Sequence, residues 1–229
     1  MSDKNKGFTI TELLVAMVIA GIVMTAIYSV YSSQQKSYVT QEQAAAMQQN
    51  LRAAMFYVAR DIRMAGCDPT GNANAGIITA DATSIHFTKD TRGAAHGSAS
   101  DGDTLDPDEN ITYSLYDAYS DGDNDLGRKV GDGNNQPVAE NIDALAFTYI
   151  FADGDAGLPD ETDADPTNDC NDIRSVQITI VARAERPDRG YTDTQSYTNK
   201  QGTVILAAQN DHFRRRFLTT TIKCRNLGL

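Results

Sequence analysis

An uninterrupted apolar stretch close to the N-terminus constrains this chain more than any other feature. It runs from Phe8 to about Tyr31 and contains a single charged residue, Glu12. A helix needs about 20 apolar residues to cross roughly 30 Å of hydrocarbon, so this stretch is long enough to span a membrane. Lys4 and Lys6 precede it. Because basic flanks stay on the cytoplasmic side, we expect the chain to be anchored in the inner membrane with its C-terminal bulk in the periplasm.

The stretch differs from an ordinary secretory signal, in which a small residue marks a cleavage site after the apolar core. Here the small residue, Gly7, stands before the core. A carboxylate inside a membrane helix is costly unless it is paired, so Glu12 is predicted to have a function. The alternative is that Glu12, only one turn into the helix, extends its carboxylate to the membrane interface.

Residues 7–13, Gly-Phe-Thr-Ile-Thr-Glu-Leu, resemble the processing site of type IV prepilins and pseudopilins. The resemblance implies that a prepilin peptidase cleaves between Gly7 and Phe8 and that the new Phe8 amine is methylated. It further implies that the hydrophobic segment is retained, and that Glu12 pairs with the free Phe8 amine of a neighbouring subunit to set its register in a filament. A plain single-pass anchor is the alternative.

Beyond the apolar stretch the helical pattern continues. Apolar residues recur at spacings of three and four, which predicts one buried stripe of an amphipathic helix; they are Ala44, Met47, Leu51, Met55, Val58, Ile62 and Ala65. Gly66 and Pro69 then form a stop signal. We therefore expect a leader at 1–7, a transmembrane and filament-core helix at 8–31, an amphipathic continuation at 32–66 and a periplasmic head at 67–229.

The head has the pattern of short strands separated by Gly, Asn and Asp. The expected strands are 76–80 and 84–88, which form a hairpin, followed by 111–119, 142–151, 174–183 and 217–225. Such a sheet must bury one face, and the second half of the long helix is the available cover. The predicted fold class is α+β, with a long N-terminal helix packed on an antiparallel sheet.

Acidic residues are concentrated in the middle of the head. Residues 101–172 contain 20 of the 31 acidic residues of the chain but only two basic ones, Arg128 and Lys129. Nucleic-acid binding by the head as a whole is therefore disfavoured, because phosphates would be repelled. Such a segment is typical of solvated loops or of sites for hard cations.

Two acidic loops are candidate calcium sites. Asp121, Asp123, Asp125 and Asp132 stand at positions 1, 3, 5 and 12 of a loop, as ligands do in calcium loops, although Leu126 replaces the usual glycine. A second cluster comprises Asp153, Asp155, Asp160, Glu161, Asp163 and Asp165. The alternative for both is solvated surface loop. Ca²⁺ is thus the one candidate cofactor, and no cofactor is required.

The chain has three cysteines, so it can form at most one internal disulfide, and at least one cysteine then remains a thiol. We predict a Cys170–Cys224 disulfide, because both residues lie beside expected strands that antiparallel pairing could bring together, and we expect Cys67 to be a free or buried thiol. The alternative is three small buried side chains. No catalytic motif is present, so no catalytic residue and no enzyme activity is predicted.

Two further passages carry resemblance. Residues 51–69 and 213–227 resemble PilW-type minor pilins, and the J-type minor pseudopilins of type II secretion are similar in plan. Within the second passage, Arg214, Arg215 and Arg216 form either a solvated cluster at a strand edge or a docking patch for an acidic neighbour. The resemblance implies a minor pilin that helps initiate type IV pilus assembly with other minor pilins and the major pilin. The alternatives are a J-type minor pseudopilin of a type II secretion system or a membrane-anchored, calcium-dependent adhesin or binding module.

Overall fold

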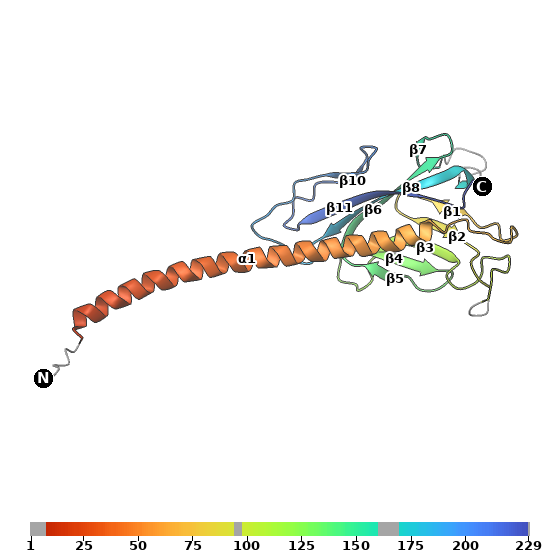
Figure 1. The fold of residues 1–229 in the computed structure, drawn as a ribbon. Coiled ribbons are helices and arrows are strands. Elements are labelled where there is room, and N and C mark those ends of the chain that lie inside the picture. Colours follow the sequence, from red (N-terminus) through yellow and green to blue (C-terminus); the bar gives the residue numbers. More distant parts are fainter. Residues whose placement is uncertain (1–7, 94–97, 160–169, 229) are drawn as a thin grey trace. The chain divides into compact units, whose positions relative to one another are not determined.

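The computed structural model describes residues 8–93, 98–159 and 170–228 (Figure 1). It contains a helix of 53 residues, α1 (Ile10–Ile62), followed by β-strands. The chain divides into two compact units, Met1–Ala44 and Ala45–Leu229. The second unit contains the end of α1 and all of the described strands. The predicted α+β fold class, a long N-terminal helix and antiparallel sheets, is confirmed.

The end of α1 follows the predicted stop signal. Gly66 has a φ of +74°, a left-handed conformation that glycine adopts without steric cost. A side chain at this position would also collide with Leu227, because an added Cβ would lie 2.3 Å from its Cδ2 atom. The amide of Gly66 donates to the carbonyl of Thr88 at 3.0 Å, which ties the end of the helix to the head.

The first half of the head is a five-stranded antiparallel meander in which neighbours in sequence are neighbours in the sheet. Its strands are β1 (Ile77–Ala80), β2 (Ile85–Thr88), β3 (Asn110–Tyr116), β4 (Asp125–Val130) and β5 (Gln136–Ala139). The hairpin and the third strand were expected from the sequence. β4 and β5 were not, because their sequences, DLGRKV and QPVA, have no alternating apolar pattern.

The second half is a four-stranded antiparallel sheet in the order β11-β8-β6-β7. Its strands are β6 (Ile142–Phe151), β7 (Ala156–Gly157), β8 (Ile173–Arg183) and β11 (Arg215–Lys223). A small two-stranded sheet pairs β9 (Tyr197–Thr198) with β10 (Val204–Leu206). The prediction of a single sheet is therefore wrong, because the described strands form three sheets. β11 lies at an edge of its sheet, as Figure 1 shows.

The end of α1 covers the head as predicted. Six residues of the predicted stripe are buried: Met47, Leu51, Met55, Val58, Ile62 and Ala65. Opposite them, each sheet supplies fully buried apolar side chains, such as Phe87 and Ile111 from the first and Ile178 and Ile180 from the second. Burial of apolar surface at this junction therefore stabilises the packing of α1 on the head.

A buried carboxylate fixes α1 on the first sheet. Asp61 is 2% exposed. It accepts hydrogen bonds from Arg128 Nε of β4 at 2.7 Å, from the Tyr113 hydroxyl of β3 at 2.9 Å and from Arg60 Nε at 3.0 Å. Burial alone would favour the neutral acid, but the hydrogen bonds and charges of Arg128 and Arg60 outweigh it and lower the pKa of Asp61. The carboxylate is therefore held in its charged form.

Replacing Asp61 by asparagine is expected to lower the free energy of unfolding at pH 7 and to weaken its dependence on pH in the acid range. A carboxylate with a lowered pKa stabilises the fold above its unfolded pKa of about 3.9, and this contribution is lost as the pH falls through the folded pKa. Urea unfolding of the full-length protein in detergent at pH 7 and pH 3 measures both effects. Asp108→Asn removes a carboxylate that also pairs with Arg128 but is exposed, so it should have little effect; equal effects of the two variants would contradict the assignment.

Candidate functional site

The start of α1 contains a reciprocal hydrogen-bond pair. The Thr9 amide donates to Glu12 Oε2 at 2.9 Å, and the Glu12 amide donates to Thr9 Oγ1 at 3.3 Å. The Thr9 hydroxyl adds a third bond to Glu12 Oε2 at 2.8 Å. This is a capping box, which satisfies amides that have no partner within the helix. Glu12 thus has a local structural role that the sequence analysis missed, although the spacing Thr-x-x-Glu is its usual signal.

The residues of the expected processing site are only partly described. Phe8 is 91% exposed, whereas Gly7 lies outside the described residues. The apolar side chains that follow on α1 are also exposed. An 18-residue window of α1 has a mean hydropathy of 2.4, which makes this helix long and apolar enough to cross a membrane. Cleavage at Gly7–Phe8, methylation of Phe8 and the register role of Glu12 stay predictions.

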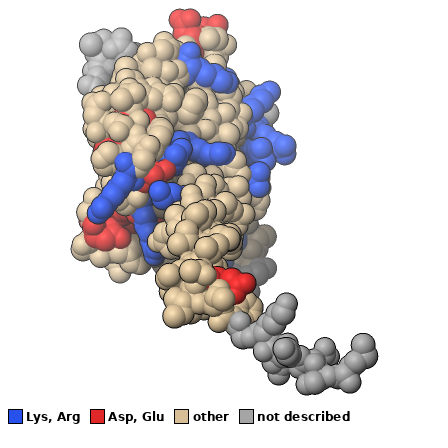
Figure 2. Space-filling model, turned by 90° about the vertical axis from the view of Figure 1, so that its left-hand side faces the viewer, with Lys and Arg blue, Asp and Glu red and all other residues tan. Residues whose placement is uncertain are grey.

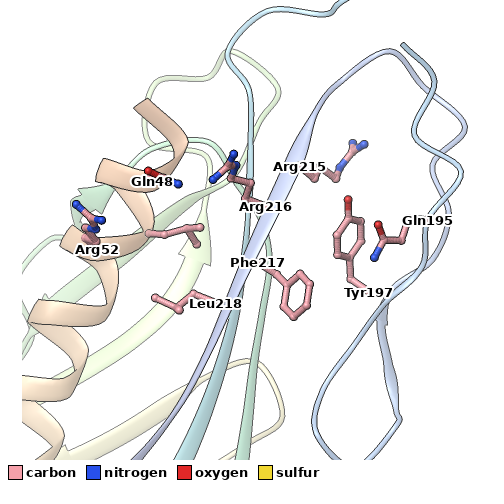
Figure 3. A pocket seen from close by; sticks show the side chains of 9 residues that line it. Gln48, Arg52, Gln195, Tyr197, Arg215, Arg216, Phe217 and Leu218 are labelled. Atoms are coloured by element: carbon pink, nitrogen blue, oxygen red, sulfur yellow. The ribbon is translucent and has the colours of Figure 1, made fainter. Parts of the chain in front are cut away.

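A shallow groove runs along the head between the end of α1 and the edge strand β11. We call it the α1–β11 groove. Two adjoining hollows that share Arg52 and Leu218 form it. Figure 3 shows Gln48 and Arg52 on the helix opposite Arg216 and Leu218, whereas Arg215 and Phe217 extend to the other side of β11, toward Tyr197. The Tyr197 and Phe217 rings meet edge-to-face with centroids 5.9 Å apart.

The groove is basic although the whole chain has a net charge of −11. The arginines that line it come from both elements and from the residues that follow them; they are Arg52, Arg60, Arg63, Arg215, Arg216 and Arg225. No acidic residue is among the described residues that line its two hollows. Basic side chains also cover more of the face drawn in Figure 2 than acidic ones do. The charge of the head is therefore unevenly distributed, which favours an acidic partner at the groove.

The three consecutive arginines, Arg214 just before β11 and Arg215 and Arg216 within it, do not form one cluster. Arg214 pairs with Asp188 at 2.9 Å and stacks on the Tyr191 ring. The side chain of Arg215 is only 2% exposed and binds Asp193 at 2.9 Å and Asp211 at 2.6 Å, as well as Asp143. Arg216 is exposed and lines the groove. Arg215 is therefore neither solvated at a strand edge nor part of a docking patch, because three carboxylates enclose it. Of the three arginines, only Arg216 is available for docking.

The four predicted calcium ligands are not gathered at one point. Asp121 and Asp123 lie side by side, but Asp123 is engaged by Arg183 at 2.6 Å. Asp125 is buried and accepts the amides of Ala118 and Asn141. β4 begins at Asp125 and Asp132 follows its end, so an extended strand of six residues, roughly 20 Å long, holds Asp132 away from Asp121, Asp123 and Asp125. The middle of this loop pattern is therefore a strand in the structure.

In the second acidic cluster, residues 160–165 lie outside the described part of the chain. Calcium binding by these loops stays a prediction.

The cysteines are thiols in the structure, so the Cys170–Cys224 disulfide is not formed in it. Both residues are nevertheless buried, and both lie near Tyr149. Burial raises the pKa of the Cys224 thiol to about 12, which makes its reactive thiolate scarce. Cys67 is partly buried. The disulfide stays a prediction, and the mass of the protein from an oxidising compartment would test it.

Comparison with known proteins places the chain in a family. Residues 103–226, more than half of the chain, match the family described as type IV pilus-assembly protein W, PilW. The chain belongs to the PilW family. Residues 2–28 of this PilW-family protein also match the prokaryotic N-terminal methylation motif. That match contains Gly7, Phe8 and Glu12, and together with the exposed apolar helix it indicates a membrane-anchored pilin-type subunit.

Among solved structures, the type IV-like pilin TTHA1219 from Thermus thermophilus is similar to this PilW-family protein. The two share 13% sequence identity with a TM-score of 0.49, and the alignment covers 79% of this chain and 98% of the other. No curated protein matched the sequence.

Proposed function

We propose that this protein is a minor pilin, incorporated at low copy, that helps to initiate assembly of a type IV pilus at the inner membrane. The observation that carries the proposal is the match of residues 103–226 to type IV pilus-assembly protein W. The N-terminal methylation motif supports it, because that motif implies processing by a prepilin peptidase. In this account the peptidase cleaves between Gly7 and Phe8, and the head lies in the periplasm before it reaches the pilus.

The mechanism is physical and needs no chemical step after processing. The apolar surface of α1 is exposed in the single chain, so it must be covered by lipid or by other helices. In the membrane it is covered by lipid, and in the filament by the helices of neighbouring subunits. Glu12 would then pair with the Phe8 amine of a neighbour, and their attraction in a medium of low dielectric constant would fix the axial position of each subunit.

The α1–β11 groove is the surface that we assign to a neighbouring pilin. It combines apolar side chains, such as Met55 and Phe56, with arginines such as Arg52 and Arg216, for which no ion pair with a described residue is formed, whereas Arg60 and Arg215 are paired with aspartates. A neighbour with an acidic, partly apolar surface would fit this groove. Complementary charges at such an interface mainly give specificity and a faster encounter.

Reversing the charge of the groove with Arg52→Glu and Arg216→Glu is expected to reduce the number of surface pili. Both side chains line the groove on opposite sides, so two like charges would face the acidic neighbour. The measurement is sheared surface pilin from cells that express each variant at equal levels. Arg189→Glu is the matched control, because Arg189 is exposed and does not line the groove. Equal pilus numbers in the double variant and the control would contradict the assignment of the groove to a neighbouring pilin.

Deleting the gene tests the proposal as a whole. Sheared surface pilin and proteins secreted to the medium would be measured in the same culture, with the wild-type gene restored in a second strain. The proposal predicts few or no pili and normal secretion. Intact pili with failed secretion would instead assign the protein to a type II secretion system as a J-type pseudopilin.

A further inference from the structure

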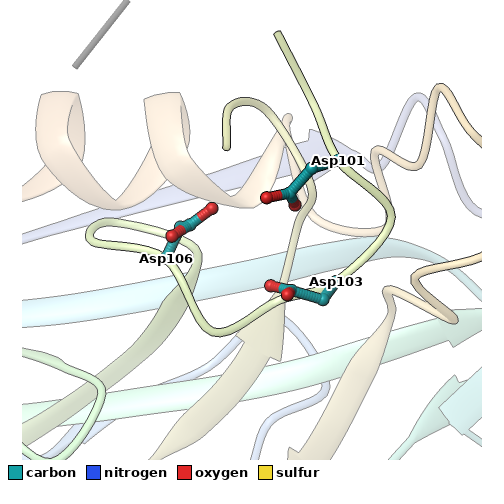
Figure 4. Close-up of side chains that lie close together, drawn as sticks. All are labelled: Asp101, Asp103 and Asp106. Carbon is teal, nitrogen blue, oxygen red and sulfur yellow. The ribbon is translucent and has the colours of Figure 1, made fainter. Parts of the chain in front are cut away.

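Three carboxylates converge in the connection between β2 and β3. Asp101, Asp103 and Asp106 each direct a carboxylate oxygen toward the same point, and these oxygens all lie within 4.8 Å of one another (Figure 4). The connection is in the head and is distinct from the loop at 121–132. Like charges at this distance repel one another, so the arrangement needs a counter-charge.

Two of the acidic side chains in this connection are buried with an oxygen left unpaired. Asp106 is 9% exposed, and its Oδ2 atom has no hydrogen-bond partner among the described residues. Glu109 is fully buried; its Oε1 accepts the amides of Thr91 and Arg92 at 2.7 and 3.0 Å, while Oε2 is unpaired within the same described part of the chain. Buried polar atoms are nearly always hydrogen-bonded, and a bound ion or water is the usual explanation for an exception.

Glu109 and Asp106 belong to one turn. The Glu109 amide donates to the Asp106 carbonyl at 3.2 Å. The guanidinium of Arg92 belongs to the same connection, but it donates to the Pro107 carbonyl at 2.9 Å and lies 3.9 Å from Asp108. The negative charge at Asp106 is thus only partly compensated.

The connection is anchored at its base. Asp90 is fully buried, and its Oδ2 accepts the amide of Gly102, the residue between two of the three converging aspartates, at 3.1 Å. The Asp90 amide in turn donates to the Cys67 carbonyl at 2.6 Å, next to the end of α1. A ligand held by Asp101 and Asp103 would therefore fix a segment that is tied to the helix end.

We propose that Asp101, Asp103 and Asp106 bind a Ca²⁺ ion. All three ligands are carboxylate oxygens, which hard cations prefer, and waters would complete the shell. Calcium–oxygen distances of about 2.3–2.6 Å allow ligand oxygens on opposite sides of the ion to lie up to about 5 Å apart, whereas the shorter distances of Mg²⁺ require a tighter octahedron. The ion supplies the missing counter-charge and orders the β2–β3 connection. This inference does not depend on the role of the protein in a pilus.

The test is a calcium titration of the full-length protein, purified in detergent and stripped of metal with a chelator. Calorimetry should show binding with an affinity of about 0.1–1 mM or tighter, the range of extracellular calcium modules, and the midpoint of thermal unfolding should rise with Ca²⁺. Asp101→Asn should abolish both responses. Asp101 is exposed and its side chain forms no hydrogen bond with the described residues, so this variant should fold normally without calcium.

Two matched controls separate this site from other acidic loops. Asp132→Asn removes one charge from an exposed turn and should keep the calcium response. Asp121→Asn tests the loop at 121–132 and should keep it as well. The proposal is overturned if wild-type protein does not respond to Ca²⁺, or if Asp121→Asn abolishes the response while Asp101→Asn keeps it. An equal response to Mg²⁺ at the same concentration would overturn the choice of Ca²⁺.

Discussion

The Glu12→Ala variant is expected to be processed and inserted in the membrane but to enter filaments far less than the wild type. Its helix lacks the carboxylate that would pair with the Phe8 amine of a neighbour. Removing one partner of a buried charge pair costs about 2–5 kcal/mol, which corresponds to a loss of roughly thirty-fold or more in incorporation. The measurement is the ratio of the protein in sheared pili to the protein left in the membrane fraction, by immunoblot.

Two further variants separate the pairing role of Glu12 from its role in the capping box. Glu12→Gln removes the charge, but glutamine at this position can still accept the Thr9 amide. Thr9→Ala removes the hydroxyl that binds Glu12 and keeps the charge. The account predicts that Glu12→Gln fails like Glu12→Ala and that Thr9→Ala retains most incorporation. Normal incorporation of Glu12→Gln, with failure of Thr9→Ala, would show that Glu12 only caps α1.

The Arg215→Met variant is expected to lose about 3–5 kcal/mol of the free energy of unfolding, because it leaves buried charges without a counter-charge. Arg215 is enclosed by Asp143, Asp193 and Asp211, and the side chains of Asp193 and Asp143 are 1% and 13% exposed. Methionine fills a similar volume but donates no hydrogen bond. Urea unfolding of the full-length protein in detergent, at pH 7, measures the loss.

Arg216→Met is the matched control for this experiment. It changes the next residue of the same strand in the same way, but Arg216 is exposed and forms no ion pair with any described residue. Its free energy of unfolding should stay within about 0.5 kcal/mol of the wild type. A loss in Arg215→Met no larger than that of Arg216→Met would contradict the buried network.

Strands with a strong apolar pattern could be predicted from the sequence, whereas those stabilised mainly by their neighbours could not. β6 was predicted with the observed bounds, and β8 to within one residue. β4 was missed because Gly127, Arg128 and Lys129 occupy its centre. β4 is stabilised by its pairing with β3 and by the Arg128–Asp61 contact, and a local pattern in its own sequence shows neither.

The candidate sites also differ in whether their residues lie close together in the sequence. Gly7, Phe8 and Glu12 lie within six consecutive residues, so a local motif was enough to single them out. The α1–β11 groove requires residues near position 52 and near position 216 to meet, and the burial of Arg215 requires three carboxylates from separate segments. The loop at 121–132 matched a spacing rule, yet Asp101, Asp103 and Asp106 converge without matching it. The spacing of acidic residues predicts metal ligands only where the backbone between them forms a compact loop. At 125–130 the backbone is instead an extended strand.

In the proposed function, the processed chain is a subunit of the filament. The most direct measurement is the N-terminal mass of this protein recovered from purified, sheared pili. The account predicts a low-copy chain that begins at Phe8 and carries a methyl group on its amine. Absence of the protein from pili, or a chain that still begins at Met1, would contradict it.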